Sequence, residues 1–271
     1  MKINIKDYVA REQDYIREKV SNFVATPSLL ILQHGDDPAS NSYIKGKMKD
    51  AGKCGISATL IKSDSAEEIL DFAVRNMQYY DGIILQEPHN LPLMYVDQIF
   101  GNMEDYQDVD GMDVMSVHTP CTPKGIMEII AEFYPKEDIA GEVAVVVGKG
   151  HLVGKPLVPL LMESGCTVIS CNSKTADLAK YTKMADIVVS ATGKENLITR
   201  DMLKDGAFVI DAGITFDENG KLCGDCDKAI YDDEQIAITT VPGGVGLTTR
   251  LALMKNTFEA FKFKMARLRV R

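Results

Sequence analysis

Residues 142–154 read EVAVVVGKGHLVG and combine an apolar run with three closely spaced glycines. The first part of this stretch, 142–147, is almost entirely apolar, which is typical of a strand buried on both faces of a parallel sheet. Gly148, Gly150 and Gly154 follow with GxGxxxG spacing, directly ahead of a predicted helix. Glycines there permit a tight turn and the close approach of a pyrophosphate, to which the helix N-terminus offers free N–H groups. The stretch predicts a nucleotide-binding turn, with a plain strand–helix turn as the alternative.

Strands and amphipathic helices alternate on both sides of this stretch. The expected strands are 28–35, 56–62 and 81–88 before it, and 166–171, 186–193 and 206–213 after it. Repeated strand–helix–strand units predict a parallel sheet covered by helices. A turn-rich segment over 103–123 separates the two series, so we expect an α/β protein whose two domains join there. A helix over 248–266 closes the chain.

The overall composition restricts the partners of the chain. It has 271 residues, of which 45% are hydrophobic and 25% charged, so it can bury a core and should not be disordered. With 39 acidic and 30 basic residues the net charge is −9, which argues against binding to nucleic acid. We find no apolar run of the ~20 residues that span a bilayer, and no signal peptide at the N-terminus. We therefore expect a cytoplasmic protein that does not bind membranes.

Two local clusters have ordinary explanations. The residues Cys223 and Cys226 have CxxC spacing, but a zinc site needs about four ligands and no second pair follows. We therefore predict ordinary thiols and no bound metal. A basic cluster near the C-terminus is expected to be the solvated end of a helix, where cations are favourable; it consists of Lys262, Lys264, Arg267, Arg269 and Arg271.

The residues after the strand 166–171 bear on the choice of cofactor. Sites that prefer NAD usually place Asp or Glu at this position, where it binds the ribose hydroxyls. Here the sequence is Asn172-Ser173-Lys174, without an acid. A neutral hydroxyl and a nearby cation suit a 2′-phosphate better, and Lys149 in the glycine turn offers a second cation. We predict NADP rather than NAD, with NAD still possible.

Four polar residues in the first half are candidates for chemistry. Tyr43 and Lys47 are four apart on a helix expected over 39–53, so they share one face. A lysine held in the interior can act as a base or proton shuttle, although a solvated lysine is more common. Gln86 follows the apolar run of the strand expected over 81–88. Asp110 lies in the turn-rich segment over 103–123 that joins the two domains. Each signal is weak alone.

These four residues belong to a set of motifs that follow one another in order over nearly the whole chain. The motifs are Tyr43-x-x-x-Lys47, Gln86-x-Pro88, Asp108-Val109-Asp110-Gly111, Pro120-Cys121-Thr122-Pro123-x-Gly125, Val153-Gly154-Lys155-Pro156 and Val241-Pro242-Gly243-Gly244-Val245-Gly246. In this combination the chain resembles the bifunctional methylenetetrahydrofolate dehydrogenase/methenyltetrahydrofolate cyclohydrolase family. The PCTPxG and PGGVG motifs are the most specific.

The resemblance implies an architecture. An N-terminal α/β folate-binding domain, residues 1–120 with 247–271, would join a Rossmann-type nucleotide-binding domain, residues 121–246. The closing helix would return to the first domain, and the active site would lie in the cleft between the two. The family is usually homodimeric through the nucleotide-binding domain.

It also implies chemistry. A hydride passes from 5,10-methylenetetrahydrofolate to NADP, and water then converts the 5,10-methenyl product to 10-formyltetrahydrofolate. Lys47 would handle the protons of the water step, Gln86 would hydrogen-bond it, Tyr43 would pack against the folate, and Asp110 would bind the pterin. Further substrate contacts are expected through backbone at Pro242, Gly243, Gly244 and Gly246. The expected cofactor contacts are Gly148, Lys149, Gly150, Gly154, Ser173 and Ile214.

The sequence departs from the family pattern in three places. The usual QLPLP is Gln86-Glu87-Pro88-His89-Asn90, which would place the Glu87 carboxylate near Lys47. The usual Arg-Ser of the glycine turn is Lys149-Gly150, and the usual His-Ser after the second strand is Asn172-Ser173. The last two changes bear on the cofactor more than on the reaction.

Two other classes of protein share part of this pattern. A two-domain NADP oxidoreductase of a small hydroxy acid, similar to shikimate dehydrogenase, would have the glycine turn but would not need YxxxK or PGGVG. A nucleotide-sensing regulator could keep the fold without turnover. Retention of Tyr43, Lys47, Gln86 and Asp110 argues against a regulator.

Overall fold

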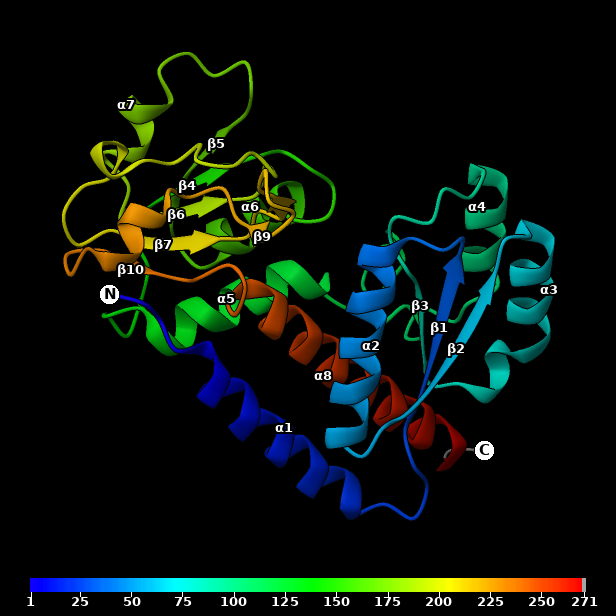
Figure 1. The fold of residues 1–271 in the computed structure, drawn as a ribbon. Helices are drawn as coiled ribbons and strands as arrows, with labels where there is room; N and C mark the ends of the chain where they lie inside the picture. The colour runs from blue at the N-terminus through cyan, green and yellow to red at the C-terminus, as the bar shows by residue number, and fades with distance from the viewer. Residues whose placement is uncertain (270–271) are drawn as a thin grey trace. The chain divides into compact units, whose positions relative to one another are not determined.

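The computed structural model describes residues 1–269, which form two compact units (Figure 1). Unit 1 contains Met1–Val9 and Thr122–Thr249, and unit 2 contains Ala10–Cys121 and the chain from Arg250 onward. Three helices have residues in both units: α1 (Ile5–Ser21), α8 (Val245–Arg269) and, by its first residue alone, α5 (Cys121–Phe133). Each unit has its own parallel sheet, so the predicted α/β class is confirmed.

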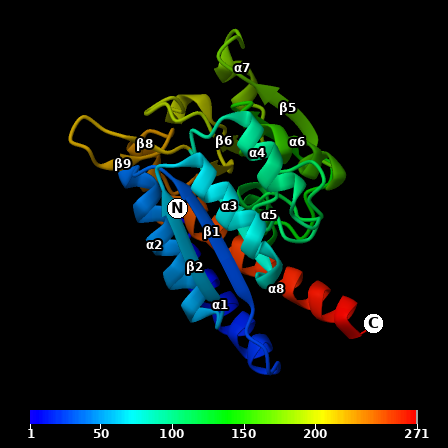
Figure 2. The same cartoon turned by 90° about the vertical axis from the view of Figure 1, so that its right-hand side faces the viewer.

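Unit 2 contains a three-stranded parallel sheet. Its strand order is β2-β1-β3, with β1 over Ser28–His34, β2 over Ser57–Ser63 and β3 over Gly82–Leu85. Residues 29–32 of β1 are completely buried, because the central strand is covered on both faces. The helices are α2 (Pro38–Lys53), α3 (Ala66–Asn76) and α4 (Leu93–Gly101). In both views α2 and α3 lie on either side of the sheet (Figures 1 and 2).

The irregular segment after α4 supports the edge of this sheet. Residues 107–109 run parallel to β3, because the Ile83 amide donates to Gln107 O at 2.7 Å and the Val109 amide donates to Ile83 O at 3.4 Å. Gly82 permits this approach, since a Cβ there would lie 2.8 Å from Val109. As a result, the residues after β3 and those after Val109 emerge at the same end of the sheet.

Unit 1 contains a five-stranded parallel sheet of order β10-β7-β6-β4-β5. The strands are β4 (Val143–Val147), β5 (Thr167–Cys171), β6 (Ile187–Ser190), β7 (Phe208–Asp211) and β10 (Ala237–Ile238). The helices are α5 (Cys121–Phe133), α6 (Gly154–Glu163) and α7 (Leu178–Thr182), and a hairpin pairs β8 (Thr215–Phe216) with β9 (Leu222–Cys223). Short 3-10 helices cover Arg200–Met202 and Lys228–Asp232, and one more, Met77–Tyr79, belongs to unit 2. Val145, Val188 and Val209 lie at the centre of the core.

The basic end of α8 differs from its prediction. Lys264 is half-buried and forms an ion pair of 3.2 Å with Asp81, and Arg267 pairs with Glu104 at 3.1 Å. The expectation of a solvated cluster is therefore wrong for Lys264, because a buried carboxylate of the same unit lies within its reach. The side chain of Arg269 and the whole of Arg271 lie outside the described residues.

Residues 1–269 contain no helix with the length and apolar character needed to cross a membrane. Over the same range, three or more His, Cys, Asp or Glu side chains nowhere gather as metal ligands would. All six cysteines are buried and unpaired with one another.

Candidate active site

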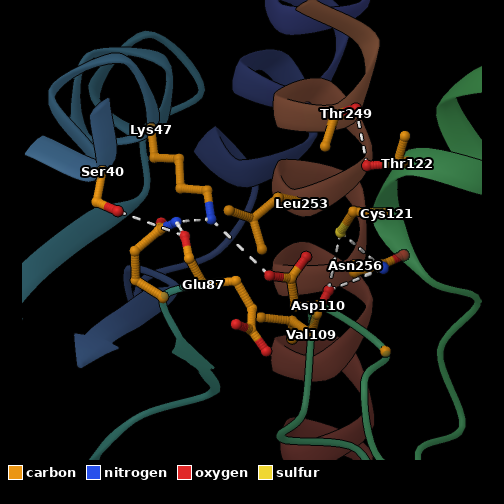
Figure 3. Close-up of polar contacts among 12 residues, drawn as sticks. Ser40, Lys47, Glu87, Val109, Asp110, Cys121, Thr122, Thr249, Leu253 and Asn256 are labelled. Carbon is orange, nitrogen blue, oxygen red and sulfur yellow. Dashed lines mark hydrogen bonds and ion pairs between the residues drawn. The ribbon is translucent and has the colours of Figure 1, made fainter. Parts of the chain in front are cut away.

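Three of the predicted catalytic side chains meet in unit 2 (Figure 3). Lys47 is 3% exposed, and its Nζ donates to Oε1 of Gln86 at 3.0 Å. The same Nζ lies 3.8 Å from Oδ2 of Asp110. We call these three side chains the Lys47 group. One amide oxygen and one carboxylate thus offset the cost of burying the ammonium group.

Helix α2 carries Lys47 into the interior because its buried face includes this position. Asp37 caps the helix by accepting a hydrogen bond of 2.6 Å from the Ser40 amide, and Pro38 occupies the first turn. Ile44, Lys47 and Ala51 follow at helical spacing and are all buried. The lysine therefore occupies a place on an apolar stripe, where the core packs around its stem.

Gln86 is oriented by its own neighbour in sequence. Its backbone amide donates to Leu32 O at 2.8 Å, which continues the pairing of β3 with β1. Its Nε2 donates to Glu87 O at 2.6 Å. Because the amide nitrogen is engaged there, the amide oxygen faces Lys47.

Asp110 is positioned by the segment before it, which α8 holds. Nδ2 of Asn256 donates to Val109 O at 2.9 Å and to Thr119 O at 3.2 Å, and the Cys121 thiol donates to Val109 O at 3.2 Å. Leu253, one turn earlier in α8, points toward Lys47 and Asp110 (Figure 3). Asn256 was not predicted, because its partners lie more than a hundred residues away in the chain.

The residue before Val109 shapes the same turn. The Asp108 carboxylate is buried and accepts hydrogen bonds from the Gly111 amide at 3.1 Å and the Asp113 amide at 2.8 Å. Burial raises the pKa of Asp108 to about 6, and the neighbouring Asp110 carboxylate adds to this rise.

Tyr43 lies one turn before Lys47 and is flanked by two cations. The Nζ of Lys47 is 5.3 Å from the ring centroid, and the guanidinium carbon of Arg250 is 5.9 Å from it. Arg250 also donates from Nε to Oδ2 of Asp50 at 2.6 Å. A Cβ at Gly46 would come within 3.2 Å of this guanidinium group. Arg250 was not predicted, although the buried position of Asp50 on the α2 face was a signal that a cation should lie opposite.

The carboxylate beside Lys47 is that of Asp110, whereas Glu87 has another partner. Nε2 of His89 lies 3.2 Å from Oε1 of Glu87, and the Leu91 amide donates to Nδ1 of His89 at 3.1 Å. Since Nδ1 accepts, Nε2 carries the proton and donates to Glu87. Figure 3 shows the Glu87 carboxylate pointing away from Lys47, and an influence of Glu87 on the charge of this lysine stays a prediction.

In unit 1, the glycine turn follows β4 as predicted. Gly148 has φ of +112°, and a Cβ there would lie 2.3 Å from Ala191 O. At Gly154 a Cβ would lie 1.9 Å from Gly148 O, whereas Gly150 faces open space. The first and last glycines are thus needed for the turn itself, and the middle one leaves room in front of α6. Such a cradle at a helix N-terminus fits a pyrophosphate.

The other predicted cofactor residues lie at the same edge of the sheet. Lys149 is exposed beside β4, and Ser173 is exposed just after β5. Hydrogen bonds of Asn172 with Thr175 and Lys174 define the turn that carries Ser173. Ile214 follows β7 and is 59% exposed. Because β4, β5 and β7 are parallel, their carboxyl ends share one edge, where open α/β sheets bind ligands.

The predicted substrate residues Pro242, Gly243, Gly244 and Gly246 also belong to unit 1 and lie between β10 and the first turn of α8. Gly243 has φ of +105°, and a Cβ at Gly244 would lie 2.7 Å from Thr240 O. The Thr240 hydroxyl donates to Pro242 O at 3.0 Å. Gly246 faces open space. Two of these glycines are therefore explained by the turn, and Gly246 leaves its backbone accessible.

One unit of the chain has a parallel sheet with a glycine turn. The other is an α/β unit that buries a Lys–Gln–Asp group. Together these features define a two-domain nucleotide-dependent enzyme of the α/β class. The sequence model described as tetrahydrofolate dehydrogenase/cyclohydrolase, catalytic domain, matches residues 3–110, and that of the NAD(P)-binding domain matches residues 120–265. The chain therefore belongs to the tetrahydrofolate dehydrogenase/cyclohydrolase family.

Individual relatives agree with this assignment. The bifunctional protein FolD of Caldanaerobacter subterraneus subsp. tengcongensis is 37% identical, over 99% of both chains. The crystal structure of bifunctional FolD from Campylobacter jejuni superposes with a TM-score of 0.88 at 31% identity, covering 97% of this chain and 99% of that one. FolD from Trypanosoma brucei, solved with NADP and an inhibitor, gives a TM-score of 0.89 at 27% identity, with 98% of each chain covered.

These findings confirm the resemblance read from the motifs and the predicted pairing of a catalytic domain with an NAD(P)-binding domain. They also confirm the predicted class of enzyme, a tetrahydrofolate dehydrogenase and cyclohydrolase with an NAD(P)-binding domain. The hydroxy-acid oxidoreductase and the non-catalytic regulator are thereby removed as alternatives.

Proposed function

We propose that this chain oxidises 5,10-methylenetetrahydrofolate with NADP and then hydrolyses the 5,10-methenyl product to 10-formyltetrahydrofolate. The observation that carries the proposal is the Lys47 group, in which a buried lysine is held between an amide oxygen and a carboxylate. Burying an ammonium group costs free energy. In this family a buried lysine can serve the hydrolysis of the 5,10-methenyl product, because that reaction requires proton transfer.

In the hydrolysis, water adds to the methenyl carbon and loses one proton, which leaves a hydroxyl group on that carbon. The bond between this carbon and N5 then breaks as the hydroxyl loses its proton to become the formyl carbonyl and N5 takes up a proton, so that one proton is released overall. Lys47 is the residue that handles these protons, with Gln86 fixing the position of its Nζ. Asp110 accepts N–H donors of the pterin, and Tyr43 packs against the folate. The backbone at Gly246, together with Pro242, Gly243 and Gly244, contributes further substrate contacts.

In the oxidation, the chain mainly aligns two bound molecules. NADP, when bound, would supply the acceptor for the hydride of the methylene carbon. Gly148, Gly150 and Gly154 accommodate the pyrophosphate, and Lys149 and Ser173 bind the 2′-phosphate. Ile214 contributes an apolar contact. The two exposed polar groups and the absence of an acid after β5 support NADP over NAD.

We also propose the domain boundaries, the oligomeric state and the cellular location of the enzyme. Residues 1–120 with 247–271 form the folate-binding domain, and residues 121–246 form the nucleotide-binding domain. The division of the structure near Cys121 and Thr249 supports these two boundaries, whereas Met1–Val9 group with unit 1. Two copies associate through the nucleotide-binding domain, and the enzyme works in the cytoplasm. Sedimentation equilibrium tests the dimer, and a monomer at micromolar concentration would contradict it.

An absorbance assay tests the function. The chain is mixed with 5,10-methylenetetrahydrofolate and NADP, and methenyl absorbance should rise and then decay as 10-formyltetrahydrofolate forms. Hydrolysis is followed separately by supplying 5,10-methenyltetrahydrofolate without NADP. Failure to form or consume the methenyl compound under both conditions contradicts the proposal.

A further inference from the structure

Two buried carboxylates in unit 1 have no part in the function proposed above. Asp211 is the last residue of β7, and Asp225 lies between the two cysteines of the CxxC stretch. Both are 0% exposed. Burying a carboxylate is costly unless its oxygens are well supplied with hydrogen-bond donors. The donors therefore indicate what each carboxylate holds in place.

The Asp225 carboxylate binds the segment that follows β6. Its Oδ2 accepts from the Ser190 hydroxyl at 2.6 Å and from the Thr192 amide at 2.7 Å, and its Oδ1 accepts from the Lys194 amide at 2.9 Å. Three donors within five consecutive residues thus converge on one side chain. This arrangement fixes the path of residues 190–194.

The Asp211 carboxylate holds the backbone that carries Asp225. Its Oδ1 accepts from the Asp225 amide at 2.9 Å and from the Gly213 amide at 3.1 Å, and its Oδ2 accepts from the Cys226 amide at 2.9 Å. The two carboxylates therefore act in series, with Asp211 fixing residues 225–226 and Asp225 fixing residues 190–194.

Glycines permit this close packing. A Cβ at Gly213 would lie 2.1 Å from Oδ1 of Asp225, and a Cβ at Gly224 would lie 2.1 Å from Oδ2 of Asp211. Any side chain at either position would displace a carboxylate. The CxxC spacing thus surrounds a Gly-Asp pair whose contacts explain both residues without metal or redox chemistry.

The segment held by Asp225 forms one wall of the glycine turn. The Ala191 amide donates to Val147 O at 2.8 Å, and the Ala191 carbonyl is the group that a Cβ at Gly148 would strike, at 2.3 Å. A shift of residues 190–194 by a few tenths of an ångström would therefore change the space at the turn. Gly213, on which Asp225 packs, directly precedes Ile214, so both sides of the expected cofactor site depend on the same carboxylates.

We propose that Asp225, held in place by Asp211, is a positioning residue for NADP because it fixes residues 190–194 beside the glycine turn. The inference rests on the proposed function, in which this turn binds the cofactor. Aspartate is required over asparagine, since the three donors aimed at it need acceptors on both oxygens, and an amide would turn an NH₂ group toward one of them.

The test compares Asp225→Asn with Asp232→Asn, an exposed aspartate of the same unit whose ion pair with Lys2 lies in solvent. The dissociation constant of NADP is measured by calorimetry, without turnover. Hydrogen exchange measures the protection of the Thr192 and Lys194 amides. Hydrolysis of directly supplied methenyltetrahydrofolate, which consumes no NADP, reports whether the rest of the chain is folded.

Asp225→Asn should raise the dissociation constant of NADP at least tenfold and abolish protection of the two amides, while Asp232→Asn changes neither. An unchanged dissociation constant in a folded Asp225→Asn chain overturns the inference. A loss of hydrolysis equal to the loss of NADP binding also overturns it, because the role would then be general stability. Failure of the parent chain to bind NADP instead contradicts the proposed function.

If Asp225→Asn does not fold, Ser190→Ala replaces it and removes one of the three donors. A dissociation constant raised at least twofold, with hydrolysis retained, supports the inference. An unchanged constant overturns it.

Discussion

The guanidinium group of Arg250 donates from Nε to Oδ2 of Asp50 at 2.6 Å, which joins α8 to α2 within unit 2. Lys53 is the other cation near this carboxylate, at 3.7 Å. The Asp50 side chain is almost fully buried, and that of Arg250 is 20% exposed. The pair is therefore partly shielded from water and lies against the ring of Tyr43.

Arg250→Ala should lower the free energy of unfolding by about 2 kcal/mol, because it leaves a buried carboxylate with only one distant cation. Urea denaturation of both single variants and of the double variant with Asp50→Asn measures the coupling. Arg75→Ala is the control, since its ion pair with Asp71 is exposed and should be worth about 0.5 kcal/mol or less. Equal losses for the two arginines would contradict the prediction.

Lys47→Met should abolish hydrolysis of methenyltetrahydrofolate while leaving measurable hydride transfer, because only the water step uses its protons. The two activities are measured separately by absorbance. Lys45→Met changes an exposed lysine of the same helix and should affect neither. Hydrolysis at the parental rate in Lys47→Met would show that the assignment of this lysine is wrong.

Lys149→Ala should raise the KM for NADP about tenfold and leave the KM for NAD within twofold, since NAD lacks the 2′-phosphate. One lost charge-assisted hydrogen bond corresponds to about this factor. Steady-state dehydrogenase kinetics with both cofactors give the comparison, and Lys183→Ala, an exposed lysine of unit 1, is the control. A parallel rise for both cofactors would place Lys149 elsewhere than at the 2′-phosphate.

Asp108 should make the fold less stable as the pH rises through its titration. Its pKa is raised by burial from 3.8 to about 6, so between these values the folded chain retains a proton that the unfolded chain has released. The contribution of this group to the free energy of unfolding is therefore complete below about pH 4 and falls as the pH rises toward 6. The difference corresponds to roughly 3 kcal/mol.

The measurement compares Asp108→Asn with the parent by urea denaturation at pH 4 and pH 7. Relative to the parent, the variant should gain up to about 3 kcal/mol between the two pH values, because asparagine does not titrate. Asp97→Asn, at an exposed position of α4, should show no such gain. A constant difference between variant and parent would mean that Asp108 is ionised throughout.

Sequence alone located those parts of the site that depend on local periodicity. Lys47 falls on a helical stripe, Gln86 ends an apolar strand, and the glycine turn follows another, so each could be placed from neighbouring residues. Arg250, Asn256 and Asp225 were missed because their roles are set by partners far along the chain. Lys264 was misplaced for the same reason, since its pairing with Asp81 requires knowledge of what α8 packs against.

The course of the chain through α8 has a consequence for biosynthesis. Every residue of unit 1 precedes Arg250, whereas unit 2 needs Arg250, Leu253 and Asn256 to complete the surroundings of Tyr43, Lys47 and Asp110. On the ribosome, the nucleotide-binding sheet can thus close while the folate half still awaits its last helix. The surroundings of the Lys47 group are therefore completed after all residues of unit 1 have been synthesised.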